Sequence, residues 1–329
     1  MLLSDFSSPY PGHAESFNTP EGIDLVEELE EEGKIVFVFI DEVHKSLYNH
    51  WGGQFRRDML TIPATIRAQT VDPTNIPVLA MSATLTLEER KEVEKELCID
   101  SKSVVFISAC PIQPNMKLMN IVRNNKFGDE IDDVVTEEGD LQLLKKIFLA
   151  KFEQCIHDND FSNFKKTMVF VKNLNDAISI NNYLCTKYSF IPVESRPWVI
   201  NHSKKQSVSS HDISVRSDEG SIQLYLTTNT MLMGLNIPQI RIVVMLGPLS
   251  MLADLLQALG RASRREEEGR ARCVLYTLYN NRDLVHHVSP CVVDFCKSVS
   301  CLKKFCNNHF GWPDAPSGGD WCCSVCNGV

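Results

Sequence analysis

The feature that most constrains this chain is an uninterrupted apolar run at residues 35–40 (IVFVFI), which leads directly into two acidic residues. A strand with one face in water alternates apolar and polar side chains, whereas a strand covered on both faces is apolar throughout. The run therefore predicts a buried strand in a parallel sheet. Because such sheets carry helices on both faces, we expect an α/β protein.

Further apolar segments alternate with helical patterns along the chain. Residues 78–81 and 104–107 predict two more strands, and residues 86–97 predict a helix with Thr86 as its N-cap. The pattern weakens between about Cys110 and Gly139, and a second series follows. It predicts helices over 141–157, 175–188 and 251–259, and strands over 167–171, 198–201, 223–227, 240–246 and 272–276.

This alternation predicts three parts: an α/β lobe over residues 1–109, a second lobe over 110–290 and a cysteine-rich segment over 291–329. The formal net charge of −9 argues against a protein that binds nucleic acid through overall positive charge, so any such contact must be local. The sequence contains no apolar run of the roughly 18 residues that a membrane span needs, and no signal-peptide core. We expect a soluble intracellular protein.

Cysteine usage indicates metal binding. Seven of the 12 cysteines fall between Cys291 and Cys326. Twelve are too few for a disulfide-dense scaffold of this length, and clustering in an intracellular chain points to thiolate ligands instead.

The residues that carry chemistry begin directly after the first buried strand, with Asp41-Glu42-Val43-His44. Open parallel sheets place their ligands at the carboxyl ends of the strands. In a nucleotide hydrolase of this design the first acid holds Mg²⁺, usually through water, and the second polarises the attacking water. Two acids after a strand are common by chance, so the pair gains weight only from the motifs that accompany it.

Ser82-Ala83-Thr84 ends the next apolar strand about forty residues later, where hydroxyl groups can hydrogen-bond to the acid-and-histidine loop. In this order residues 41–44 resemble motif II and residues 82–84 resemble motif III of superfamily 2 helicases. With Thr19-Pro20-Glu21 and a loop containing Trp51, Phe55 and Arg56, the chain resembles RecQ helicases in particular. The resemblance implies two RecA-like parallel-sheet lobes, the first incomplete, followed by a small helical zinc-binding module.

The resemblance also implies contacts with nucleic acid. An aromatic residue beside an arginine grips single-stranded bases by stacking and cation–π contact, at about 1–3 kcal/mol per stacked base. The alternative is that the Trp and the Phe are packed in a hydrophobic core. The loop is also two residues longer than the usual family spacing. The implied contact residues are Trp51, Phe55, Arg56, Ser82, Thr84 and, in the second lobe, Thr228.

The second lobe contains two further motifs. Residues 228–238 resemble motif V, although Leu232 stands where the family generally has glycine. Residues 257–264 (QALGRASR) resemble motif VI, in which arginines reach across the interlobe cleft to the γ-phosphate. The implied nucleotide contacts are Gly234, Asn236, Gln257 and Gly260.

Arg264 is the expected arginine finger, with Arg261 three residues away on the same face of a helical turn. A planar, permanently charged guanidinium stabilises the charge on the transferred phosphoryl group, and such fingers contribute roughly 10³–10⁵ in rate. The alternative is a solvated basic cluster balanced by glutamates 266–268.

The tail resembles the RecQ zinc module. Cys301 precedes a loop that ends in Cys323-x-x-Cys326, and such a knuckle suits tetrahedral coordination of Zn²⁺. The fourth ligand stays open between Cys322 and Cys306, with Asp320, at the position of a family cysteine, the weakest candidate. The five-residue repeat of cysteines 291, 296, 301 and 306 turns each about 140° from the last on a helix, so these four cannot all face one metal.

Two interpretations remain open. The first is a partial RecQ-like 3′-to-5′ helicase, nuclear by resemblance, that uses ATP, Mg²⁺ and Zn²⁺ on single-strand/duplex DNA junctions. The second is a degenerate remnant that binds nucleic acid or a protein partner without turnover. A third candidate, an RNA helicase of the DEAD-box type, is disfavoured by the DEVH sequence, the aromatic loop and the cysteine tail.

The sequence contains no GxxxxGK[ST] loop, which helicase motors use to cradle the β- and γ-phosphates. We therefore expect this polypeptide alone to show weak or no ATP hydrolysis. The measurement is phosphate release by the purified chain with and without DNA. A DNA-stimulated rate comparable to that of an intact motor would contradict the expectation.

Overall fold

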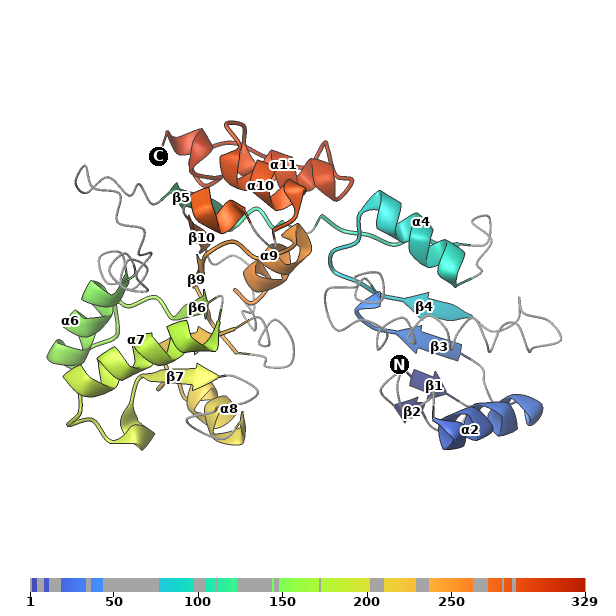
Figure 1. The fold of residues 1–329 in the computed structure, drawn as a ribbon, viewed down its shortest axis with the longest axis horizontal. Helices are drawn as coiled ribbons and strands as arrows, with labels where there is room; N and C mark the ends of the chain where they lie inside the picture. The colour runs from blue at the N-terminus through green and yellow to red at the C-terminus, as the bar shows by residue number, and fades with distance from the viewer. Residues whose placement is uncertain are drawn as a thin grey trace. The chain divides into compact units, whose positions relative to one another are not determined.

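The computed structural model describes two compact units (Figure 1). The first comprises Met1–Pro111 with His309–Trp312, and the second comprises Ile112–Asn308 with Pro313–Val329. The described residues are 2–4, 9–11, 19–33, 37–43, 77–97, 104–110, 112–122, 144, 148–171, 173–201, 210–228, 237–262, 272–279, 281–285 and 288–328.

The first unit has a four-stranded sheet in the order β2-β1-β3-β4. The apolar run expected to form a buried strand does so as β3, and β4 pairs with it in parallel. Val38 and Ile40 of β3 are fully buried, which explains their apolar character. β1 was not expected and adds antiparallel to β3. The strands are β1 (Leu2–Ser4), β2 (Pro9–Pro11), β3 (Phe37–Ile40) and β4 (Val78–Ala80).

The described residues of the first unit include two helices, α2 (Pro20–Glu31) and α4 (Leu87–Glu96). Thr86 is the N-cap of α4, as expected: its side chain accepts from the backbone N–H of Glu89, and the Glu89 carboxylate accepts from the N–H of Thr86. This reciprocal capping box satisfies two amides that the helix leaves unpaired.

The prediction of a strand at residues 104–107 is wrong. Residues 104–110 have no regular secondary structure, and Val105 and Ile107 are 85% and 90% exposed. The Arg90 guanidinium lies 3.9 Å from the centre of the Phe106 ring. The next strand is instead β5 (Met116–Val122), which alternates buried and partly exposed side chains at its start and falls in the stretch where the pattern looked weak.

The second unit is built on a six-stranded sheet in the order β5-β10-β9-β6-β8-β7, and all five pairings are parallel. All five residues of β6 are buried, as a central strand covered on both faces requires. All five strands that follow β5 in the chain were expected within two residues of their observed starts. The remaining strands are β6 (Thr167–Val171), β7 (Trp198–Asn201), β8 (Leu224–Thr227), β9 (Ile242–Leu246) and β10 (Cys273–Tyr279).

Helices cover both faces of this sheet. α6 (Ala150–Asp158) and α7 (Leu174–Lys187) bury their apolar sides against one face, together with residues of β6, β8 and β9. On the other face, the Tyr225 hydroxyl donates to Ser217 Oγ in α8, 2.8 Å away. The remaining helices are α8 (Ser210–Asp218), α9 (Leu252–Leu259), α10 (Pro290–Lys297) and α11 (Leu302–His309), with 3₁₀ turns at Val193–Ser195, Asn281–Leu284 and Val325–Asn327.

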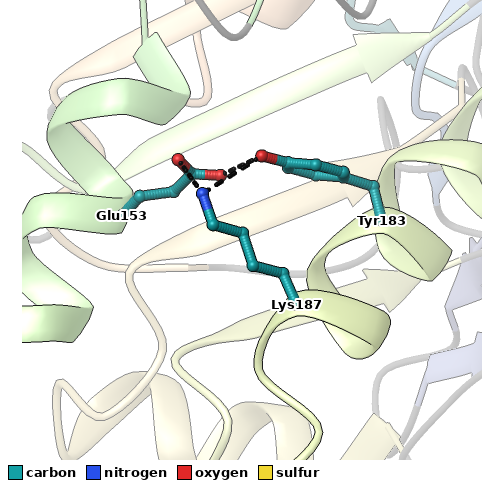
Figure 2. A network of polar contacts seen from close by, with 3 residues as sticks. All are labelled: Glu153, Tyr183 and Lys187. Carbon is teal, nitrogen blue, oxygen red and sulfur yellow. Dashed lines mark hydrogen bonds and ion pairs between the residues drawn. The ribbon is translucent and has the colours of Figure 1, made fainter.

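A polar network joins α6 to α7 at the rim of this core (Figure 2). The Glu153 carboxylate accepts from the Tyr183 hydroxyl and from Lys187 Nζ, each at 2.7 Å. The hydrogen bond from Lys187 to Glu153 is the main reason that the pKa of the lysine lies above its ordinary value. The network fixes the mutual orientation of two helices whose apolar sides meet below it.

The Phe152 ring is central to the core of the second unit. It is fully buried, and its centroid lies 5.3 Å from that of Phe164 and 6.4 Å from that of Trp198. We predict that Phe152→Ala destabilises this unit by about 3–5 kcal/mol, because it removes buried area and leaves a cavity. Urea denaturation followed by circular dichroism measures the effect.

The matched control is Phe190→Ala. Phe190 is 76% exposed, so the same truncation is expected to change stability by less than about 1 kcal/mol. Equal effects of the two substitutions would show that the aromatic core is assigned incorrectly.

Candidate functional site

The two acids of the first unit stand where the sequence placed them, at the carboxyl end of β3. Asp41 is exposed and Glu42 is partly exposed. Glu42 has a backbone φ of 54°, in the left-handed region, and its N–H donates to Asp41 Oδ1 at 2.8 Å. Glutamate in this conformation is strained, and such strain concentrates at functional sites. The sequence gives no signal for this turn.

The structure brings this acid pair beside the motif III-like segment. Met81 N–H donates to the Ile40 carbonyl at 2.8 Å, and Val43 N–H donates to the Met81 carbonyl at 2.9 Å. Ser82 Oγ accepts from Thr84 N–H at 3.1 Å, so this hydroxyl shapes its own turn. Thr84 is buried, and its Oγ1 has no hydrogen-bond partner among the described residues.

In the second unit the motif VI-like residues surround the end of α9, whose eight residues are all buried. Gln257 and Arg261 are each 8% exposed, and Arg261 N–H donates to the Ala258 carbonyl at 3.0 Å as the helix ends. Gly260 has an ordinary helical φ of −64°, so the backbone does not demand glycine there. Thr228, directly after β8, is also buried.

Asp41 and Glu42 belong to the first unit and Arg261 to the second, so the shared nucleotide crevice implied by the resemblance stays a prediction. Several expected site residues lie outside the described residues. They are His44, Trp51, Phe55, Arg56, Gly234, Asn236 and Arg264.

The tail brings four thiols together. The Sγ atoms of Cys301, Cys322, Cys323 and Cys326 all lie within 4.8 Å of one another. In a tetrahedral Zn²⁺ site with Zn–S bonds of about 2.3 Å, neighbouring sulfurs are roughly 3.8 Å apart. The Cys301–Cys322 Sγ separation of 3.3 Å is close to that value. These four donors fit Zn²⁺, and they are the set that the sequence favoured.

The surroundings of the cluster favour a thiolate at Cys301. Burial raises the pKa of its thiol, but the backbone N–H of Lys304 and hydrogen bonds from Cys322, Cys326 and Cys323 outweigh burial and lower the pKa to about 7. Burial raises the pKa of Cys322 to about 11. The lowered pKa of Cys301 favours its thiolate form, and thiolate is the form that metals bind.

The alternative ligands stand apart from this cluster. Cys306 does not belong to the group of four, and burial raises the pKa of its thiol well above the ordinary value. Burial likewise raises the pKa of Cys296 to about 12 and that of Cys291 to about 11. These three cysteines behave as buried or half-buried neutral thiols. Asp320 also lies outside the group.

Two residues that support the thiol cluster were not predicted from the sequence. Lys303 is 4% exposed, and its Nζ donates to the carbonyls of Pro114 and Trp321. The Trp321 ring N–H donates to the Asn115 carbonyl at 2.7 Å. The position of Trp321, directly before the cysteine pair, was an available signal, whereas nothing in the sequence marks Lys303 as buried.

Comparison with known proteins identifies the second unit. Residues 148–266 match the family of the helicase conserved C-terminal domain. The matched range lies within the second unit. This match supports the superfamily 2 helicase class, and its range contains strands β6 to β9 and helices α6 to α9. Among curated proteins, none matches the sequence.

Solved structures share the fold. S. cerevisiae Dbp5 bound to RNA and ADP BeF3 is 14% identical with a TM-score of 0.52, over 89% of this chain and 62% of that chain. Mss116p (NTE and C-tail double deletion) bound to ssRNA and AMP-PNP is 16% identical with a TM-score of 0.53, over 80% and 47% of the two chains. The chain thus spans about three-fifths of the length of Dbp5 and under half of that of Mss116p.

The expected α/β fold with a parallel-sheet RecA-like lobe is confirmed. Within the described ranges, every helix is too short or too polar to cross a bilayer.

We predict that Cys301→Ser and Cys326→Ser each lower the zinc content of the purified protein from about one ion per chain to well below one, because each removes one of four ligands. Elemental analysis by mass spectrometry measures the content. The matched control is Cys185→Ser, since Cys185 lies on α7 outside the cluster. Unchanged stoichiometry in both cluster variants would remove the metal assignment.

Proposed function

We propose that this chain is part of a superfamily 2 helicase motor that binds nucleic acid and acts with ATP. The observation that carries the proposal is the helicase C-terminal domain at residues 148–266, with Gln257 and Arg261 held at the buried end of α9. A guanidinium fixed at a helix end is preorganised, so little reorganisation is needed when charge develops on a phosphoryl group.

In this proposal the residues take the roles that the helicase resemblance implies. Asp41 holds Mg²⁺ through water, Glu42 orients the attacking water, and His44 links this loop to the motif III-like segment. Arg264 and Arg261 stabilise the charge on the γ-phosphate. The backbone contacts of Ile40 and Val43 with Met81 support a coupling between the two motifs, because a shift of the acid loop must move the segment that follows β4.

We further propose that the motor is RecQ-like, with DNA as its substrate, 3′-to-5′ movement and a nuclear location. The support is the aromatic loop with Trp51, Phe55 and Arg56 and the four-cysteine cluster of the tail. Zn²⁺ bound there would supply a structural cross-link without redox chemistry, and it would replace the core that so short a segment lacks.

The second candidate is a catalytically inactive remnant that binds nucleic acid or a protein. The first candidate requires contact with nucleic acid, and the second permits it. Only the first requires that the protein hydrolyse ATP and release phosphate.

Binding to single-stranded DNA and RNA of matched sequence tests the proposal, with fluorescence anisotropy as the measurement. We predict salt-dependent binding, with DNA preferred, and that Phe55→Ala weakens it by about 1–3 kcal/mol through the loss of base stacking. The matched control is Phe190→Ala, an exposed aromatic of the second unit outside every helicase motif.

Each result has a distinct meaning. No binding to either nucleic acid would remove the motor proposal and leave a protein-binding remnant. Equal or tighter binding to RNA would remove the RecQ-like assignment alone. An equal loss in Phe55→Ala and Phe190→Ala would show that the aromatic loop has no special role.

A further inference from the structure

The sheet of the second unit has an edge strand, β5, whose outer side is occupied by the cysteine segment. Leu118 N–H donates to the Cys322 carbonyl at 3.1 Å, and Ser324 N–H donates to the Leu118 carbonyl at 2.9 Å. Cys323 and Leu118 thereby form a parallel β-bridge. Two of the four clustered thiols thus lie on a segment that pairs with the sheet as a further strand would.

Side chains reinforce this pairing along β5. Asn120 N–H donates to Ser324 Oγ at 3.2 Å, and the Asn120 side-chain amide donates to the Phe295 carbonyl in α10 at 3.1 Å. At the start of the strand, Trp321 Nε1 donates to the Asn115 carbonyl, and Lys303 Nζ bridges the carbonyls of Pro114 and Trp321. Backbone groups at positions 114, 115, 118 and 120 therefore have hydrogen-bond partners in the tail.

Two cations hold the Trp321 ring in place. The Arg272 guanidinium lies 4.9 Å from the ring centre, and Lys117 Nζ lies 5.5 Å from it. Lys117 belongs to β5, and Arg272 directly precedes β10, the neighbour of β5 in the sheet. The tail segment is therefore fixed to both strands at this edge of the sheet.

The thiol cluster links the segment on β5 to the start of α11. Cys301 directly precedes α11, and Leu302 N–H donates to Cys323 Sγ at 3.4 Å. Gly318 N–H donates to Cys322 Sγ at 3.0 Å. Without a metal, these weak hydrogen bonds to sulfur link the parts of the cluster to one another, and charged thiolates so close together would repel one another. A bound cation removes that repulsion and links all four positions.

We propose that metal bound at these four thiols acts as a clamp on the helicase-type sheet: it holds residues 321–324 against β5, so metal loading decides whether this sheet edge is closed or open. The inference rests on the zinc site of the proposed function and goes beyond it. An unpaired edge strand exposes backbone donors and acceptors and invites pairing with another chain. Loss of metal therefore opens β5 locally, while the central strands stay paired.

Amide hydrogen exchange of the full chain, followed by mass spectrometry, tests the clamp. The protein is compared with Zn²⁺ bound and after treatment with a zinc chelator. We expect amides of β5 to exchange roughly tenfold faster without metal, the equivalent of one or two backbone hydrogen bonds. Amides of β6, the central strand, are expected to keep their protection. Unchanged β5 exchange after confirmed metal loss overturns the clamp, and so does loss of protection throughout the sheet.

A second variant separates the clamp from the metal site. Trp321→Phe removes the donor to the Asn115 carbonyl and leaves all four thiols in place, so zinc content should be retained while β5 exchange rises. Trp312→Phe is the matched control, because Trp312 lies outside residues 321–324, the segment that pairs with β5. If Trp321→Phe retains zinc and the exchange of β5 amides is unchanged, the clamp is contradicted and the zinc site is not. A chain that binds no zinc at all overturns both the clamp and the zinc assignment.

Discussion

Parallel pairing between buried strands is the constraint on which the second unit depends. β6 pairs with β8 on one side and β9 on the other, and all its side chains are buried. No water reaches its backbone, so every peptide group must be paired, and helices must cover both faces. Polar chemistry is consequently excluded from the middle of the sheet. It collects where strands and helices end, at Thr228 after β8 and at Arg261 after α9.

The same rule explains the first unit. The acids follow β3 at once because the strand itself admits no charge, and the turn that exposes them forces Glu42 into a left-handed conformation. Hydrogen bonds between residues 40–43 and Met81 then place the two motifs side by side. The resulting arrangement holds a carboxylate pair and a buried hydroxyl on adjacent strand ends, and open α/β sheets bind their ligands outside the carboxyl ends of the strands. In the tail, four thiols lie within 4.8 Å of one another beside the buried side chains of Phe295 and Leu302, and this donor set fits Zn²⁺.

The sequence predicted best where burial is complete. Uninterrupted apolar runs located β3 and β6, and the Thr86 capping box located the start of α4. It failed at residues 104–107, where a run of high strand propensity has no partner in the described structure and stays exposed. It also missed β5, whose alternating side chains reflect an edge position. Strand propensity records how well a residue fits a pleated surface, and it cannot say whether a neighbouring strand is present.

The candidate site divides in the same way. By itself the sequence determined the α/β class, the order of the motifs and three of the four clustered cysteines, because these depend on residue type and spacing along the chain. Only the tertiary structure decided that Cys322 joins the cluster while Cys306 does not, that Lys303 is buried, and that the cysteine segment pairs with Leu118. Those facts depend on which groups remote in the chain meet in space. Backbone pairing across some two hundred residues leaves no periodic trace in the sequence, since it is made by peptide groups that every residue has.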